Sequence, residues 1–189
     1  MSNIDLFQNN KYVYIKDAIP ADICNIFAQY TLFEEKNNFS PEGANEQVPA
    51  MHSVYGDSLM ESVLLYCKDI IEENTGLNLF PTYSYYRVYR NGASLAPHTD
   101  RPACEISATL FLGRNYEGES WPIFIEDKNY IMNEGDLIVY RGRELNHYRY
   151  EFEAKPEDFH SQVFLHYVDA DGEFSDQRYD GRKELGTKK

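Results

Sequence analysis

The second half of the chain alternates apolar and polar residues in a series of short segments. From Leu79 onward the period is two, which predicts strands near 80–89, 106–112, 123–125, 136–140 and 161–168. Turn-forming residues separate these strands, at Asn91-Gly92, 113–118, 127–129 and Gly142. Short strands divided by such turns are typical of β-sandwiches and barrels. The core is therefore expected to be a two-layered or closed β structure.

The first half of the chain favours one strand and two helices. Residues 11–18 alternate and are rich in Tyr, Val and Ile, which predicts a strand. Pro20 and Asp22 favour the first turn of a helix. The apolar stripe of that helix would consist of Ile23, Ile26, Phe27 and Tyr30.

A second helix is expected to begin at a cap formed by Asp57 or Ser58, to run to about Asn74 and to end at Gly76. Its apolar stripe would consist of Leu59, Val63, Leu64, Cys67, Ile70 and Ile71. Two helices ahead of a run of strands indicate an α+β fold that is mainly β, with the helices packed on one face of a sheet.

Two polar segments lie outside these elements. Residues 36–57 contain Pro41, Gly43, Pro49 and Gly56 and predict a long loop, which would be either a lid or a disordered insert. The tail after Asp171 is also polar, and we expect it either to wrap the surface or to fray.

Composition limits the classes of partner and the compartment. The 189 residues suit one domain, and the formal net charge of −13 with no basic run makes a nucleic-acid partner unexpected. Three widely spaced cysteines favour reduced thiols, hence a cytoplasmic location, over disulfides or a zinc ribbon. We see neither a secretory signal nor a run of 18 apolar residues, so we expect no membrane association.

The strand and turn that end in His98-Thr99-Asp100 carry the clearest chemical signal. Residues i and i+2 of an extended chain point the same way, so the imidazole of His98 and the carboxylate of Asp100 can reach one point. A third ligand must come from elsewhere, and the segment 133–147 offers His147. Two histidines and one carboxylate with open positions suit a non-heme Fe(II) ion that activates O2.

Other histidines compete for the third place. His160 and His166 lie inside a continuous predicted strand, not just after the Gly135-Asp136 strand and its turn, and we rank them below His147. His52 falls in the polar segment 36–57 and receives no role.

These pieces together resemble the 2-oxoglutarate/Fe(II)-dependent dioxygenase superfamily, and within it the prolyl 4-hydroxylase-like branch. The resemblance rests on the Tyr86–Tyr89 strand, His98-Thr99-Asp100, Gly135-Asp136 before an apolar strand, and His147. It implies one domain over residues 1–189 built on a double-stranded β-helix, or jelly roll. A helical support would span about 1–78, the jelly-roll core about 79–170 and the polar tail about 171–189.

The resemblance also implies the site. His98, Asp100 and His147 would bind Fe(II) and form the catalytic centre, 2-oxoglutarate and O2 would be cosubstrates, and ascorbate is a possible addition. The reaction would hydroxylate a protein or peptidyl side chain of the prolyl type. A free amino acid or another small molecule is the alternative substrate, and a non-catalytic metal-binding jelly-roll module is the alternative class. The protein would be a monomer or a homodimer.

Cosubstrate binding is where this chain departs from the superfamily pattern. Members usually present an Arg or Lys on the strand after the distal histidine, but residues 159–167 contain neither. Alternation places His160 and Gln162 on one face of that strand, where either or both could hold the cosubstrate. Further donors are Tyr89 and Arg87, which share a strand face, and Arg149, which follows His147 by two. Lys155 is expected to be solvated in a turn.

Three further residues, Arg101, Cys104 and Trp121, can be explained by ordinary structural roles. Arg101 would either hold an anion at the mouth of the site or form an ion pair with Glu105 or another acid. Cys104 is expected to be buried and inert, and Trp121 to be part of the core.

Overall fold

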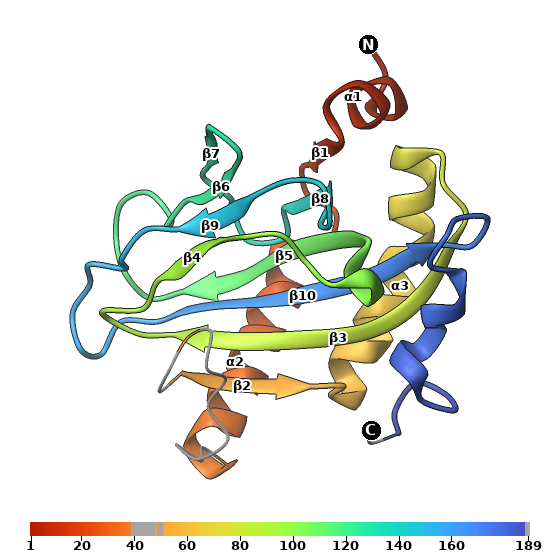
Figure 1. Cartoon of the computed structure of the whole chain (residues 1–189). Coiled ribbons are helices and arrows are strands. Elements are labelled where there is room, and N and C mark those ends of the chain that lie inside the picture. Colours follow the sequence, from red (N-terminus) through yellow and green to blue (C-terminus); the bar gives the residue numbers. More distant parts are fainter. Residues whose placement is uncertain (39–47, 49–50, 188–189) are drawn as a thin grey trace.

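Two antiparallel β-sheets face each other and form the jelly roll that the resemblance implied, in keeping with the sandwich or barrel predicted from the alternation (Figure 1). The computed structural model describes residues 1–38, 48 and 51–187. The larger sheet has the order β1 (Tyr12–Ile15), β8 (Leu137–Arg141), β5 (Ile106–Arg114), β10 (His160–Asp169), β3 (Leu79–Tyr89) and β2 (His52–Tyr55). The smaller sheet has the order β4 (Leu95–His98), β9 (His147–Arg149), β6 (Ile123–Ile125) and β7 (Lys128–Tyr130). The long strands lie where the sequence predicted them.

Helices cover the outer face of the larger sheet, as expected for an α+β fold (Figure 1). Helix α2 (Ala21–Asn38) and helix α3 (Ser58–Thr75) lie behind that sheet, and a short helix that was not predicted, α1 (Asn3–Asn10), precedes β1. The N-terminal region thus contributes helices and also the two outermost strands of the larger sheet, β1 and β2.

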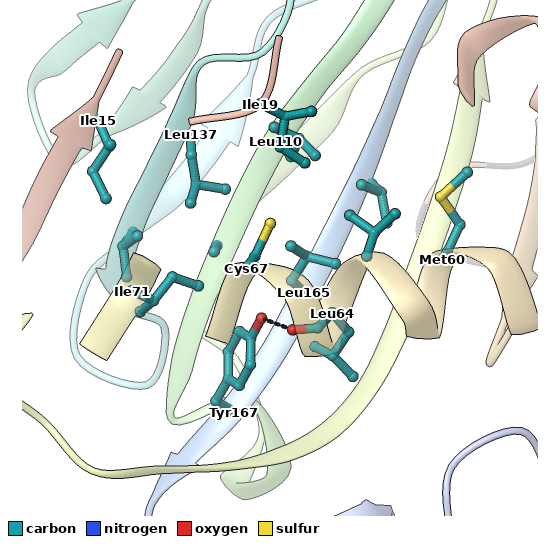
Figure 2. Close-up of a cluster of buried hydrophobic side chains, with 14 of the residues drawn as sticks. Ile15, Ile19, Met60, Leu64, Cys67, Ile71, Leu110, Leu137, Leu165 and Tyr167 are labelled. Atoms are coloured by element: carbon teal, nitrogen blue, oxygen red, sulfur yellow. Dashed lines mark hydrogen bonds between the residues drawn. The ribbon is translucent and has the colours of Figure 1, made fainter. Parts of the chain in front are cut away.

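Helix α3 confirms its predicted caps and buried stripe. The Asp57 side chain accepts a hydrogen bond from the Met60 backbone N–H at 3.0 Å, and Gly76 ends the helix with φ of 73°. Leu64, fully buried on the stripe, packs against the sheet (Figure 2). The hydroxyl of Tyr167 on β10 donates to the Leu64 carbonyl at 2.7 Å, which attaches helix α3 to strand β10.

Helix α2 corrects the predicted stripe. Ile23 and Ile26 are 38% and 61% exposed, while the buried residues of the helix are Cys24, Ala28 and Thr31. The reason is close packing through small side chains. A Cβ on Gly113 of β5 would lie 3.0 Å from the Ala28 Cβ, and the Thr31 hydroxyl lies 2.7 Å from that of Ser161 on β10. A helix so close to a sheet leaves no room for isoleucine on that face.

Three smaller predictions also need correction. The predicted strand 11–18 is shorter and spans only β1, and the turn expected at 127–129 lies at Glu126-Asp127, because Lys128 pairs with Ile125 in the sheet. The segment 36–57 is not one loop: it contains the end of α2, strand β2 and the cap of α3. The expectation of a lid was made for the whole segment 36–57, of which residues 39–47 and 49–50 lie outside the described residues.

The polar tail packs back on the fold through buried ionic groups. Arg182 donates to Glu61 on α3 at 2.6 Å, with both side chains almost fully buried, and also to the Thr82 carbonyl at 2.9 Å. The segment 175–181 forms a kinked 3-10 turn next to the start of β3 (Figure 1). Of the two expectations for this tail, wrapping is therefore confirmed and fraying is wrong as far as residue 187.

None of the described helices has the length and apolar character of a membrane span.

Candidate metal centre

The two histidines of the predicted triad come from adjacent strands of the smaller sheet. His98 ends β4, His147 begins β9, and the two residues are register partners. Asp100 follows His98 by two residues, and its backbone N–H donates to the Gly142 carbonyl at 2.8 Å. The carboxylate oxygen Oδ1 lies 3.5 Å from Nε2 of His147 and 3.7 Å from Nε2 of His98. The structure thus brings the three predicted side chains together.

Backbone carbonyls fix how each imidazole is presented. Nδ1 of His98 lies 2.9 Å from the Ala96 carbonyl, and Nδ1 of His147 lies 3.1 Å from the Leu145 carbonyl. A carbonyl can only accept, so each Nδ1 donates its proton, and in the neutral ring Nε2 keeps a lone pair. Both lone pairs belong to the nitrogens nearest Oδ1 of Asp100. This tautomer is the one that a metal between these atoms requires.

Electrostatics favour the charge states of metal ligands. Burial, followed by the proximity of His147, lowers the pKa of His98, which keeps the ring neutral. Burial alone would raise the pKa of Asp100, but its polar neighbours His147, His166 and Ser107 outweigh it and lower that pKa to about 2. The site therefore presents an ionised carboxylate and a neutral imidazole at neutral pH.

The three ligand atoms open into a cavity of about 200 Å³ between the two sheets. Besides His98, Asp100 and His147, the cavity is lined by Tyr55, Tyr83, Tyr85, Arg87, Leu95, Tyr140, Phe164 and His166. Ligand atoms of the triad lie within 4.8 Å of one another. Two imidazoles and one carboxylate on one side of such a cavity fit a facial Fe(II) site.

A second group of potential ligands, Asp100, Cys104 and His166, also lies within 4.8 Å. Its centre is filled by Ser107, whose hydroxyl lies 2.6 Å from Oδ2 of Asp100, 3.0 Å from Nδ1 of His166 and 3.2 Å from the Cys104 carbonyl. This group is therefore a hydrogen-bonded cluster centred on the Ser107 hydroxyl. His166, the lower-ranked third ligand, lies behind Ser107 as seen from Asp100.

Cys104 is buried, as expected, and its surroundings disfavour the reactive thiolate. Burial raises the pKa of its thiol to about 12, and its Sγ lies 3.0 Å from the Tyr83 hydroxyl. Trp121 is also buried, as expected for a core residue. Arg101 forms its ion pair with Asp180 of the tail, at 2.6 and 2.9 Å, and not with Glu105.

Arg87 is the one predicted cosubstrate residue that lines the cavity of the triad. Its guanidinium is 1% exposed and donates to the hydroxyls of Tyr85 and Tyr89, both at 3.3 Å. No carboxylate of the described part of the chain forms an ion pair with it, and its Nε has no hydrogen-bond partner there. A buried cation without a counter-ion is costly unless an anion joins it.

The other predicted cosubstrate residues, Tyr89, Arg149, His160 and Gln162, form a deeper layer that does not line the cavity. Arg149 stacks on Trp121 at 4.7 Å and donates to Oε1 of Gln162 at 2.6 Å. Burial lowers the pKa of Arg149 to about 10. Within the described residues, Nε of Arg149, Nε2 of Gln162 and Nε2 of His160 have no hydrogen-bond partner.

The surroundings of His160 disfavour its charged form. Burial, reinforced by the nearby Arg149 guanidinium, holds the pKa of His160 well below its usual range. The ring stacks on Phe111 at 4.4 Å, and its Nδ1 lies 3.0 Å from the Tyr116 hydroxyl. It therefore remains neutral near pH 7.

Sequence reasoning missed Ser107 and Gly142 at the site. Ser107 is one polar residue within an apolar strand, and Gly142 reads as an ordinary turn glycine. A Cβ at position 142 would lie 2.5 Å from the Cys104 carbonyl, 2.7 Å from the Ser107 hydroxyl and even nearer the Asp100 carboxylate. Only the packing of three segments shows why this residue has no side chain.

Comparison with known proteins gives matches to solved structures only. No family model matches the chain, and no curated protein matches it. A prolyl-4-hydroxylase from Pseudomonas putida is 16% identical, with 86% of this chain and 95% of that chain covered and a TM-score of 0.65. The alpha-ketoglutarate-dependent epimerase SnoN from nogalamycin biosynthesis is 14% identical, with 88% and 81% covered and a TM-score of 0.69.

A third match is a prolyl hydroxylase from Trichoplax adhaerens, solved with a peptide fragment of hypoxia inducible factor. It is 12% identical, with 95% of this chain and 91% of that chain covered and a TM-score of 0.65. These proteins share the architecture and not a closely related sequence. The chain therefore has the jelly-roll fold of the non-heme Fe(II)/2-oxoglutarate oxygenases.

Proposed function

We propose that this protein is a non-heme oxygenase that depends on Fe(II) and 2-oxoglutarate. The observation that carries the proposal is one cavity that combines a preformed set of His98, Asp100 and His147 with the buried, uncompensated guanidinium of Arg87. The first group fits Fe(II), and the second fits an anion. Bound Fe(II) would supply the activation of O2 that is coupled to decarboxylation of the 2-oxoacid.

Each residue of this site has a defined role in the proposed reaction. His98 and His147 would hold the metal through Nε2, and Asp100 through Oδ1. Arg87 would pair with the far carboxylate of 2-oxoglutarate and so replace the basic residue that strand β10 lacks. Planar guanidinium groups bind carboxylates through paired hydrogen bonds, which fixes the orientation of the ligand.

The deeper layer would support Arg87 from behind. The Tyr89 hydroxyl accepts from Arg87, and the ring of Tyr89 lies 5.0 Å from that of Trp121, against which Arg149 stacks. A second buried cation at this depth adds positive potential behind the cavity. We infer that Arg149 and Gln162 contribute through this field and through packing, and that Arg87 makes the direct contact.

A peptidyl side chain of the prolyl type is our proposed substrate. Tyr55, Tyr83, Tyr85 and Phe164 give the cavity an aromatic wall that suits a small apolar ring or chain. Two of the similar structures are prolyl hydroxylases, and one of them was solved with a peptide. The epimerase among them shows that small molecules are served by the same fold, so a small-molecule substrate is the second candidate. The three free, buried thiols support a cytoplasmic setting.

The test is 2-oxoglutarate turnover by the metal-loaded protein. The parent should convert 2-oxoglutarate to succinate and CO2 only with Fe(II) and O2, and Asp100→Ala should not. A panel of proline-containing peptides and free amino acids, each measured for faster succinate release, would separate the two substrate classes. Metal binding without any succinate from any member of the panel would favour the non-catalytic module and refute the proposal.

A further inference from the structure

The two carboxylate oxygens of Asp100 have different neighbours. Oδ1 lies next to the ring nitrogens of the two histidines, at 3.5 and 3.7 Å. Oδ2 accepts a hydrogen bond of 2.6 Å from the Ser107 hydroxyl. One oxygen therefore faces the candidate metal position, and the other is engaged by the opposite sheet.

Ser107 is in turn held by His166. The serine hydroxyl has a single proton, and its short contact with an ionised carboxylate is the strongest of its three interactions. The proton therefore points to Asp100, so Nδ1 of His166 must donate to the Ser107 oxygen across 3.0 Å. Donation runs in one direction, from His166 through Ser107 to Oδ2 of Asp100.

This chain of donors stands on rigid elements. Ser107 on β5 and His166 on β10 are register partners in the middle of the larger sheet, and both are buried. The bare Cα of Gly142 leaves the space in which the Asp100 carboxylate and the Ser107 hydroxyl meet. Residues of the larger sheet thus orient Asp100, the candidate metal ligand that follows strand β4 of the smaller sheet.

We propose that Ser107, held by His166, keeps Oδ2 of Asp100 off the metal, so that Asp100 occupies a single coordination position. The inference rests on the proposed function and assigns Ser107 and His166 as positioning residues. A facial triad leaves three positions open on an octahedral ion. A chelating 2-oxoacid needs two of them and O2 the third, so a carboxylate that bound through both oxygens would exclude part of this set.

The test compares Ser107→Ala with the conservative Ser107→Thr and with Thr109→Ala. Thr109 lies two residues further along the same face of β5, and its hydroxyl lies 3.5 Å from that of Tyr140 and not at Asp100. For each protein the dissociation constant of Fe(II), and then that of 2-oxoglutarate on the Fe(II)-loaded form, would be measured without oxygen. The thermal midpoint of each metal-free protein shows whether the fold is intact.

The expected result is a split between the two constants. Ser107→Ala should bind Fe(II) within about threefold of the parent, because the freed Oδ2 can also reach the metal, and should bind 2-oxoglutarate at least about tenfold more weakly. Ser107→Thr and Thr109→Ala should match the parent in both constants.

Two results on Ser107→Ala would overturn the inference while leaving the proposed function intact: both constants as in the parent, or both weakened together with a lower thermal midpoint. A parent protein that binds Fe(II) but no 2-oxoglutarate would overturn the proposed function, and this inference with it.

Discussion

Gly142→Ala should damage the metal site from a residue that is not itself a ligand. The new Cβ would lie 2.5 Å from the Cys104 carbonyl, about 0.9 Å short of the 3.4 Å at which ordinary contact begins, and 2.7 Å from the Ser107 hydroxyl. Its nearest neighbour would be the Asp100 carboxylate. The Cys104 carbonyl belongs to the backbone, so relieving that contact requires a backbone shift, whereas the carboxylate and the hydroxyl are side-chain groups that can move aside.

The magnitude follows from the size of that shift. Functional geometry tolerates displacements of about 0.5 Å, and pushing the ligand Asp100 itself out of position should lower metal affinity by about tenfold to a hundredfold. We expect that loss for Fe(II). Overpacking typically costs about 1–3 kcal/mol, which in a chain of this size lowers the thermal midpoint by roughly 2–12 °C.

The assay is anaerobic competition for Fe(II) against a chromophoric chelator, with thermal unfolding of the metal-free protein measured in parallel. Gly172→Ala is the matched control, because its Cβ would lie 2.9 Å from the Asp169 Cβ, in a turn that contributes nothing to the cavity. The control should lose stability and keep its Fe(II) affinity. A Gly142→Ala protein with the Fe(II) affinity of the parent would refute the claim that Asp100 is confined by this glycine.

Three further predictions concern the anion site, the buried histidine and the tail. Arg87→Gln should raise the dissociation constant of 2-oxoglutarate by about tenfold to a hundredfold without changing Fe(II) affinity, since hydrogen bonds to charged groups are worth roughly 1.5–3 kcal/mol. If variant and parent bind 2-oxoglutarate equally well, its far carboxylate does not bind at Arg87. Because the pKa of His160 is held well below its usual range, the unfolded chain binds the additional proton, and stability should fall as pH drops below about 6.5. His160→Asn should make that fall shallower, and what remains belongs to other histidines with lowered pKa values, such as His98. The dissociation constant of the parent for 2-oxoglutarate should not vary with pH between about 6 and 8 on account of His160. Glu61→Gln should cost about 3–5 kcal/mol in denaturant unfolding, because it leaves the buried Arg182 unpaired, and a loss below about 1 kcal/mol would contradict that role.

Local patterns were enough to predict the long strands and the second helix, but not the short strands β2, β4, β7 and β9. Alternation from Leu79 onward located the long strands, and the residue types at Asp57 and Gly76 marked both ends of α3. These signals depend on a few neighbouring residues, so the chain itself contains them. The i, i+2 relation of His98 and Asp100 is of the same kind.

Features that depend on packing between distant segments could not be predicted. Ile23 and Ile26 of α2 were placed on the buried face wrongly, because the contact of this helix with the sheet is made by Ala28 and Thr31 against Gly113 and Ser161. Phe27 and Tyr30 of the predicted stripe do pack against the core. The partner of Arg101 could not be identified either, because Asp180 reaches it only after the tail folds back.

The cosubstrate residues illustrate both cases. Alternation correctly put Arg87, Tyr89, His160 and Gln162 inside the barrel, where register pairs Arg87 with Gln162 and Tyr89 with His160. It could not tell their depth along the barrel. Only Arg87 lies at the level of the cavity, and the burial that makes His160 neutral is a property of the assembled core.

The metal ligands are tested most directly by an anaerobic titration of the metal-free protein with Fe(II) and 2-oxoglutarate, followed by visible spectroscopy. A weak charge-transfer band should require both additions, be absent in His147→Ala and survive in His166→Ala. The absence of any band in the parent, or its loss in His166→Ala with retention in His147→Ala, would contradict the assignment of His98, Asp100 and His147 as the metal ligands.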